Sequence, residues 1–151
     1  MLKPSKKLVL ALEAVCDIAY HGGAEPVQSQ DIARRLDLPR RYLEQVMQQM
    51  VRAGILKGVR GPKGGYRLAR ERRRITVADV FDVVRALDGQ TTEDDARAHS
   101  PLGAAVMQPF WQELEALLMQ RLRALTIEDL CDRAAALEVP SEARRGIDFV
   151  I

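Results

Sequence analysis

The sequence predicts a mostly α-helical protein with a small β-hairpin wing: a winged helix-turn-helix followed by a long C-terminal dimerisation helix. Three observations predict this fold. Apolar residues recur at helical spacing along most of the 151-residue chain, a glycine-rich hairpin pattern interrupts them at RGPKGG, and basic residues gather around that hairpin. We expect a winged helix-turn-helix domain over 1–89, a flexible acidic loop over 90–101, a long dimerisation helix over 102–125, and a short helix and tail over 126–151.

The first 54 residues contain the pattern of three helices. Ser5 is placed to cap the first, whose apolar positions recur at intervals of three and four residues: Leu8, Leu12, Val15, Cys16 and Ala19. Ser29 is placed to cap a short second helix, QDIARRL, which the turn Asp37-Leu38 separates from a third. The third helix begins at Pro39 and ends at Gly54, with these residues turned to the core: Leu43, Val46, Met47, Met50 and Val51.

A two-stranded hairpin and three more helical elements complete the prediction. The strands are ILKGV and YRLA, joined by RGPKGG. Thr76 and Asp79 form a capping-box pattern at the start of a helix that runs to Leu87 and stops at Gly89. The long helix over 102–125 carries a stripe near heptad spacing, which predicts a dimer interface: Met107, Trp111, Leu114, Leu118 and Leu122. TIEDL then begins the last short helix, and the tail after Pro140 has little pattern.

Charge is strongly segregated although the net charge is only +2. Residues 1–33 hold 3 basic and 4 acidic side chains (−1), residues 34–74 hold 13 and 3 (+10), and residues 75–151 hold 7 and 14 (−7). A block of this sign suits a polyanion, whereas the alternative is an ordinary solvated basic face.

Hydrogen-bond donors dominate the outer face of the predicted third helix. Arg41, Gln45, Gln48 and Arg52 lie opposite the apolar stripe, and Arg40 joins Arg41 near the helix start. Arginine suits guanine edges and glutamine suits adenine edges, so this helix is the candidate recognition helix in a DNA major groove. Glu44 is expected to contribute specificity by accepting a hydrogen bond, for instance from a cytosine amino group. An ordinary solvated helix face remains the alternative.

The wing supplies a second set of candidate contacts. Arg60, Lys63 and Arg67 surround glycines that let the backbone approach a phosphate or groove closely. Arg60 is the candidate for insertion into a narrow minor groove, whose negative potential attracts arginine. A glycine-rich turn of purely structural purpose is the alternative.

The stretch LEQVMQQMVRAGILKGVRGPKGGYRLAR resembles the signature of the Rrf2 family of bacterial transcription regulators. SKK near the start, DIA, ITVADV, Trp111 and LTIEDL also match, so the resemblance runs from about Ser5 to Leu130. It implies a homodimer in which the long helix packs against the partner's first helix. It also implies DNA contacts at these positions: Ser29, Arg41, Tyr42, Glu44, Gln45, Arg60 and Gly61.

The chain departs from family members that bind an iron-sulfur cluster. Those members carry three cysteines between the helix ending near Leu87 and the long helix, where this chain has none. Because such clusters are held chiefly by cysteine thiolates, we expect no cofactor and no metal site. A site built from carboxylates, His99 or a distant cysteine is the alternative. Cys16 and Cys131 are expected to be core or interface residues, with redox sensing by a reactive thiol as the alternative.

These patterns predict a cytoplasmic transcription regulator, a repressor, that acts as a homodimer on a palindromic operator in double-stranded DNA. An effector or partner protein that the sequence does not identify would set its activity. The chain shows no nucleophile elbow, P-loop or HExxH motif, so no enzyme is predicted, and no apolar run suggests a membrane segment. The alternative function is a protein-interaction module that docks a metabolic enzyme or another regulator, and the basic block could also suit RNA.

Overall fold

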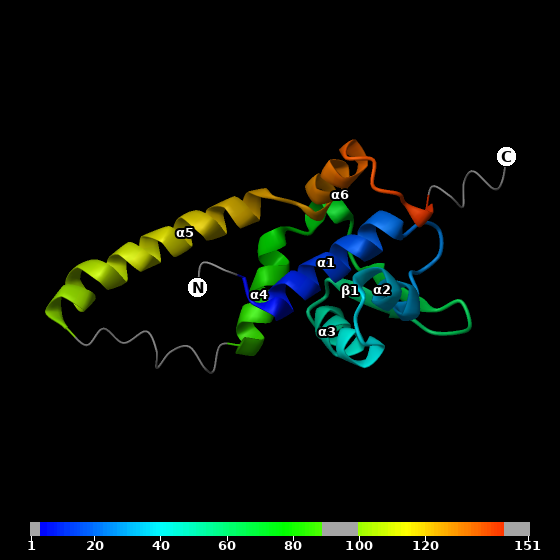
Figure 1. Cartoon of the computed structure of the whole chain (residues 1–151), viewed down its shortest axis with the longest axis horizontal. Helices are drawn as coiled ribbons and strands as arrows, with labels where there is room; N and C mark the ends of the chain where they lie inside the picture. Colours follow the sequence, from blue (N-terminus) through cyan, green and yellow to red (C-terminus); the bar gives the residue numbers. More distant parts are fainter. Residues whose placement is uncertain (1–3, 89–99, 144–151) are drawn as a thin grey trace.

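The computed structural model describes residues 4–88 and 100–143, and its elements follow the predicted winged-helix order (Figure 1). The described elements are α1 (Lys6–His21), α2 (Ser29–Leu36), α3 (Arg40–Arg52), β1 (Leu56–Val59), β2 (Gly65–Leu68), the 3-10 turn η1 (Arg72–Arg74), α4 (Val77–Asp88), the π-helical turn η2 (Gly103–Met107), α5 (Gln108–Ala124) and α6 (Ile127–Ala136). The acidic loop expected over 90–101 lies outside the described residues except for Ser100 and Pro101, and so does His99.

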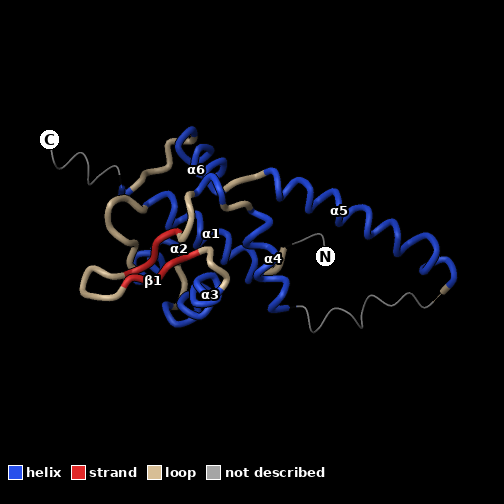
Figure 2. The backbone as a smooth tube through the Cα atoms, turned by 180° about the vertical axis from the view of Figure 1, so that it is seen from behind, coloured by secondary structure: helices blue, strands red, loops and turns tan. Residues whose placement is uncertain are grey.

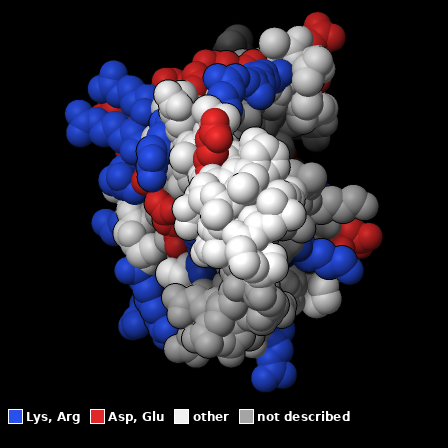
Figure 3. All heavy atoms as spheres, turned by 90° about the vertical axis from the view of Figure 1, so that its left-hand side faces the viewer, with Lys and Arg blue, Asp and Glu red and all other residues white. Residues whose placement is uncertain are grey.

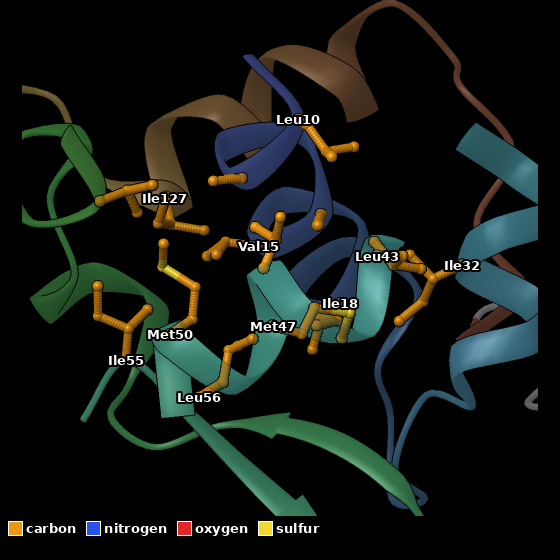
Figure 4. Packing of buried hydrophobic residues seen from close by; sticks show 14 of the residues in the cluster. Leu10, Val15, Ile18, Ile32, Leu43, Met47, Met50, Ile55, Leu56 and Ile127 are labelled. Carbon is orange, nitrogen blue, oxygen red and sulfur yellow. The ribbon is translucent and has the colours of Figure 1, made fainter. Parts of the chain in front are cut away.

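Helix α1 occupies the middle of the molecule, with α3 on one side and α6 on the other (Figure 1). The core gathers around it from α2, α3, β1, α4 and α6, as the close view in Figure 4 shows. Its largest fully buried side chains include Val15, Ile32, Leu43, Met47, Met50, Ile55, Leu56 and Ile127.

The buried face of α1 differs from the predicted stripe. Of the five predicted positions only Val15 is fully buried, whereas Leu8, Leu12, Cys16 and Ala19 are partly buried. The fully buried residues are Leu10, Ala11, Ala14, Val15 and Ile18. The prediction assumed one packed face, but α1 contacts α2, α3, α4, α6 and β2, so burial extends further around the helix. The predicted cap at Ser5 is confirmed, since its hydroxyl accepts from the Leu8 amide at 3.2 Å.

The two strands form the predicted antiparallel hairpin, drawn red in Figure 2. Leu56 pairs with Leu68 and Val59 pairs with Gly65. Val27, just before α2, adds a backbone bridge to Tyr66, with N–H···O distances of 3.0 and 2.8 Å. This bridge ties the start of the helix-turn-helix to the wing and so fixes their relative position.

Helices α4 and α6 both begin with a threonine–aspartate capping box. Thr76 and Asp79 exchange the two predicted hydrogen bonds, at 2.9 and 3.1 Å. Thr126 and Asp129 repeat the arrangement at 2.9 and 3.0 Å. Helix α6 also contributes Ile127 and Cys131 to the core, so the segment after 125 packs into the same body as residues 4–88.

The long helix predicted over 102–125 is present as η2 and α5, and it projects from the body opposite the hairpin loop (Figures 1 and 2). The sequence did not predict the wide turn η2, in which the Gln108 amide bonds to the Gly103 carbonyl five residues back. Pro109 explains this turn, because proline lacks an amide donor and its ring clashes with the preceding helical turn. None of the helices within 4–88 and 100–143 combines the length and apolar character needed to span a bilayer.

Candidate DNA-binding surface

Helix α3 separates its core residues from its polar residues as predicted. Leu43, Val46, Met47 and Met50 are buried, and Val51 is partly buried. The candidate base-contacting residues Arg40, Arg41, Gln45, Gln48 and Arg52 are exposed on the same helix, and Tyr42 is 41% exposed. The structure therefore brings five of the predicted donors onto one accessible helix, packed firmly against α1 and β1.

A tight turn sets the angle between α2 and α3. Asp37 has a left-handed backbone conformation with φ of 53°, which an aspartate tolerates better than most residues. The next amide, of Leu38, donates to the Ala33 carbonyl at 3.0 Å, so the last turn of α2 is closed before α3 starts. This is the predicted turn at Asp37-Leu38.

Ser29 does not cap α2, and that prediction is wrong. The capping position is Gln28, which makes no side-chain cap, and Ser29 is the first helical residue. The nearly buried Ser29 hydroxyl instead donates to Glu44 Oε1 at 3.2 Å and accepts from Arg40 Nε at 3.1 Å. Its hydroxyl is committed to a partner on α3 rather than to the α2 backbone, which periodicity alone could not reveal.

The negative charge of the Glu44 carboxylate is balanced by the Arg40 guanidinium, which also bonds to Ser29. Glu44 Oε1 lies 3.0 Å from Arg40 Nε, an i,i+4 ion pair on α3. Ser29, Arg40 and Glu44 therefore form one network between the two helices of the motif. Glu44, expected to accept a hydrogen bond from a base, accepts one from Arg40 within the chain, and this pairing orients the Arg40 guanidinium.

The wing residues Arg60, Gly61 and Lys63 are exposed at the hairpin turn, as predicted. Gly61 has φ of 113°, a conformation that side chains other than hydrogen rarely adopt. A Cβ on Gly65 would lie 2.2 Å from the Val27 carbonyl oxygen, so this glycine permits the bridge between the wing and the start of α2. The glycines of RGPKGG are thus required by backbone geometry, and the cations between them remain accessible.

Arg67, grouped with the wing cations in the sequence, has a structural contact. Its guanidinium donates to the Ala24 carbonyl at 2.8 Å, which fastens β2 to the loop before α2. Lys63 Nζ lies 3.8 Å from Glu25 Oε1, and both side chains are largely exposed. Such exposed pairs are worth little, so Lys63 can exchange this partner for a phosphate.

One groove runs between α3 and the wing, and the candidate residues from both elements line it. Its lining includes Ser29, Arg40, Gln48, Arg60 and Gly61. Tyr66 lies in its wall, where burial and then Glu44 raise the pKa of the phenol while Arg40 opposes them. The groove is open and bordered by cations, which suits an extended anionic backbone better than a small molecule.

Several arginines of the basic block 34–74 are paired with acids of the same chain, and one of them, Arg35, is largely buried. Arg70, Arg72 and Arg73 pair with acids, namely Asp79, Glu128 and Glu71 respectively. Arg35 pairs with Asp17 at 2.8 Å, beneath the surface of α1 and α2. The charge count alone could not distinguish these arginines from those beside the wing.

The thiols of the chain do not fit an iron-sulfur cluster. Cys131 is buried and Cys16 half-buried, both in the core where α1 packs against α6. Burial raises the pKa of Cys16 to about 12, with Cys131 and nearby acids adding to it, and burial also raises the pKa of Cys131. Thiolates are the form that binds iron, and these groups favour the thiol. Among the residues at 4–88 and 100–143, no three His, Cys, Asp or Glu side chains are grouped to hold a metal ion.

Comparison with known proteins points to one family of transcriptional regulators. The sequence profile described as "Rrf2: Iron-dependent Transcriptional regulator" matches residues 4–133. The HTH-type transcriptional regulator IscR of Vibrio atlanticus is 31% identical over 152 residues, covering 99% of this chain and 86% of its own. Protein rrf2 of Nitratidesulfovibrio vulgaris is 30% identical over 115 residues, covering 76% and 77%.

Solved structures that resemble this chain are also transcriptional regulators of this kind. IscR of T. potens superposes with a TM-score of 0.73 at 31% identity, covering 92% of this chain and 93% of that one. CymR, the global cysteine regulator of B. subtilis, superposes with a TM-score of 0.71 at 28% identity, covering 88% and 98%. The chain therefore belongs to the Rrf2 family and is a winged-helix transcriptional regulator, not an enzyme.

Proposed function

We propose that this regulator binds a palindromic operator as a homodimer and represses transcription there. The observation that carries the proposal is the exposed row of donors on α3, set beside a wing whose Arg60 borders the same groove. Helix α3 would enter the major groove, with Arg41 and Gln45 reading base edges. Arg60 would reach the adjacent minor groove, and Lys63 would contact a phosphate.

The proposed dimer rests on the long helix made of η2 and α5. Four of its five predicted interface residues are exposed, Met107, Trp111, Leu114 and Leu118, while Leu122 is partly buried. Leu102, Val106, Phe110 and Leu117 extend the same apolar surface. Figure 3 views the molecule from the projecting end of α5, where uncharged atoms form a broad continuous area.

A monomer this small rarely exposes so many large apolar side chains along one helix, so a second copy is the occupant we infer. Of the residues of α5 only Met119 is buried. Helix α5 packs beside α4, and Arg85 and Glu115 join the two helices by an ion pair. On α1, Val9 is 46% exposed and offers an apolar site for the partner's long helix. A two-fold dimer would present two copies of α3, which matches a palindromic site.

We further propose that operator binding needs no iron-sulfur cluster, because the thiols of Cys16 and Cys131 lie in the core with raised pKa values. Repression would then be controlled by a signal other than the state of an iron-sulfur cluster.

Selection of bound sequences from a random duplex pool tests the proposal. The expected result is an inverted repeat with half-sites about one helical turn apart, and reduced transcription from a promoter that carries it. Enrichment of no sequence, or of single-stranded RNA over duplex DNA in a parallel pool, would contradict it.

A further inference from the structure

The segment Val139–Ala143, called here the C-terminal strap, folds back onto the C-terminal end of α1 and lies beyond residue 133, where the family match ends. The Tyr20 hydroxyl donates to the Val139 carbonyl. The buried Ser141 hydroxyl donates to the Tyr20 carbonyl at 2.9 Å, and the Glu142 amide donates to His21 Nδ1 at 3.1 Å. Three successive contacts therefore hold a short segment that has no regular secondary structure across most of its length.

The strap also reaches the helix-turn-helix motif. The Glu142 carboxylate lies 2.9 Å from Arg35 and 3.3 Å from Arg34, both on α2. Arg35 in turn donates two hydrogen bonds to Asp17 of α1, at 2.9 and 2.8 Å. Because the Asp17 and Arg35 side chains are only 8% and 16% exposed, this network joins α1, α2 and the strap beneath the surface.

His21 holds the strap only in its neutral form. Its Nδ1 accepts the Glu142 amide proton, while Nε2 lies 3.6 Å from Asp17 Oδ1. A proton taken from solvent by Nδ1 would place two donors against each other and abolish the bond.

The groups around His21 decide when it takes that proton. Burial and the Arg35 guanidinium lower the pKa of His21, whereas Asp17 and Glu142 act in the opposite direction with smaller effect. Among the described residues, Tyr20 lies edge-on to the His21 ring, and Arg34, which also pairs with Asp31, lies 3.3 Å from the Glu142 carboxylate. The lowered pKa keeps His21 neutral, and the strap fastened, at neutral pH.

We propose that the strap is an acid-released latch on the helix-turn-helix motif, with His21 as its sensor. The hold is complete above the ordinary histidine pKa of about 6.5 and is lost as the pH falls below it toward the lowered value in the folded protein. Release frees Arg35 and Arg34 of α2 from Glu142 and leaves Arg35 bonded to Asp17 of α1 alone. The effect on the operator rests on the proposed function, whereas the release itself does not.

Hydrogen exchange of the full-length chain without DNA tests the release. His21→Asn keeps an acceptor near the Nδ1 position but cannot take up a proton. At about pH 5.5 the strap amides of the wild type should exchange roughly three to ten times faster than those of His21→Asn, the loss of one hydrogen bond, with no difference at about pH 7.5. His99→Asn alters the other histidine of the chain and should follow the wild type. Equal exchange of wild type and His21→Asn at both pH values would overturn the proposal.

The wild type alone provides a second test should His21→Asn fold poorly. In a proton–nitrogen correlation spectrum, the Glu142 amide should titrate with the same midpoint as the His21 ring, below about 6.5. Separate midpoints, or an unmoved Glu142 amide, would overturn the latch.

Operator binding measured over the same pH range tests the coupling. The wild type should lose roughly threefold or more in affinity relative to His21→Asn at about pH 5.5, as one lost contact predicts. Equal losses would overturn the coupling to the motif. Absence of operator binding at about pH 7.5 would instead contradict the proposed function and leave the exchange result standing.

Discussion

Thr76 and Thr126 face each other in an antiparallel backbone bridge, and each caps the helix that follows it. On either side of the bridge, the Val77 amide donates to the Leu125 carbonyl at 2.9 Å and the Ile127 amide donates to the Ile75 carbonyl at 2.8 Å. The segment that follows the wing and the segment that follows α5 are therefore joined at this bridge. The proposed dimerisation helix is thus connected to the DNA-reading body by backbone hydrogen bonds.

Replacing Thr126 tests this junction. Thr126→Val removes the hydroxyl that accepts from the Asp129 amide while keeping the shape of the side chain, and should lower the free energy of unfolding by about 1 kcal/mol. Thr126→Ser retains the hydroxyl and should cost less. Chemical denaturation of the two variants measures both values, and equal destabilisation would show that the cap contributes nothing.

The capping boxes also show what sequence reasoning can reach. Thr76 with Asp79 is a local signal, spaced three residues apart, and the structure confirms it. The buried and exposed faces of α3 were likewise predictable, because helical periodicity places Leu43 and Met47 opposite Gln45.

Contacts between distant segments could not be predicted. Serine is a common capping residue, but the Ser29 side chain bonds to Arg40 and Glu44 instead. Its hydrogen-bond partners depend on how α3 packs against α2, which the sequence does not show. The strap contacts span about 120 residues of sequence, and no periodicity signals them. Pro109 was a visible signal for the π-helical turn in the long helix, and the prediction of a regular helix overlooked it.

Leu118→Asp should convert the proposed dimer to monomers, because it places a carboxylate in the apolar surface of α5, where Leu118 is 51% exposed. Sedimentation at micromolar concentration measures the change. Gln120→Asp adds the same charge at an exposed position on the same helix and should leave the dimer intact. A Leu118→Asp protein that remains dimeric would place the interface elsewhere.

Reconstitution with iron and sulfide under anaerobic conditions should leave the protein colourless, and its DNA affinity should not depend on metal or reductant. The reason is that the sequence has no cysteine between Leu87 and Leu102, and that Cys16 and Cys131 favour the thiol form. Visible absorbance is the measurement. A stoichiometric cluster whose loss alters DNA binding would refute the expectation.

Of the wing cations, Lys63 should contact the DNA phosphate backbone and Arg60 should contact the minor groove. Lys63→Ala should weaken all duplexes alike and reduce the salt dependence of log K by about one unit. Arg60→Ala should mainly lose the preference for A/T-rich flanks. Titrations at several salt concentrations measure both, with Arg123→Ala, an exposed arginine on α5, as the control. An unchanged salt slope for Lys63→Ala would remove that residue from the phosphate contacts.

The most direct test of sequence-specific recognition by α3 is the affinity of Gln45→Ala for the selected operator and for random duplex DNA. Gln45 is exposed on the outer face of α3, so its loss should leave the fold unchanged, and Gln120→Ala on α5 provides the matched control. We predict a loss of about 1–3 kcal/mol on the operator, with relaxed preference at one position in each half-site and non-specific binding almost unchanged. Equal weakening on operator and random DNA would contradict the assignment of α3 as the recognition helix.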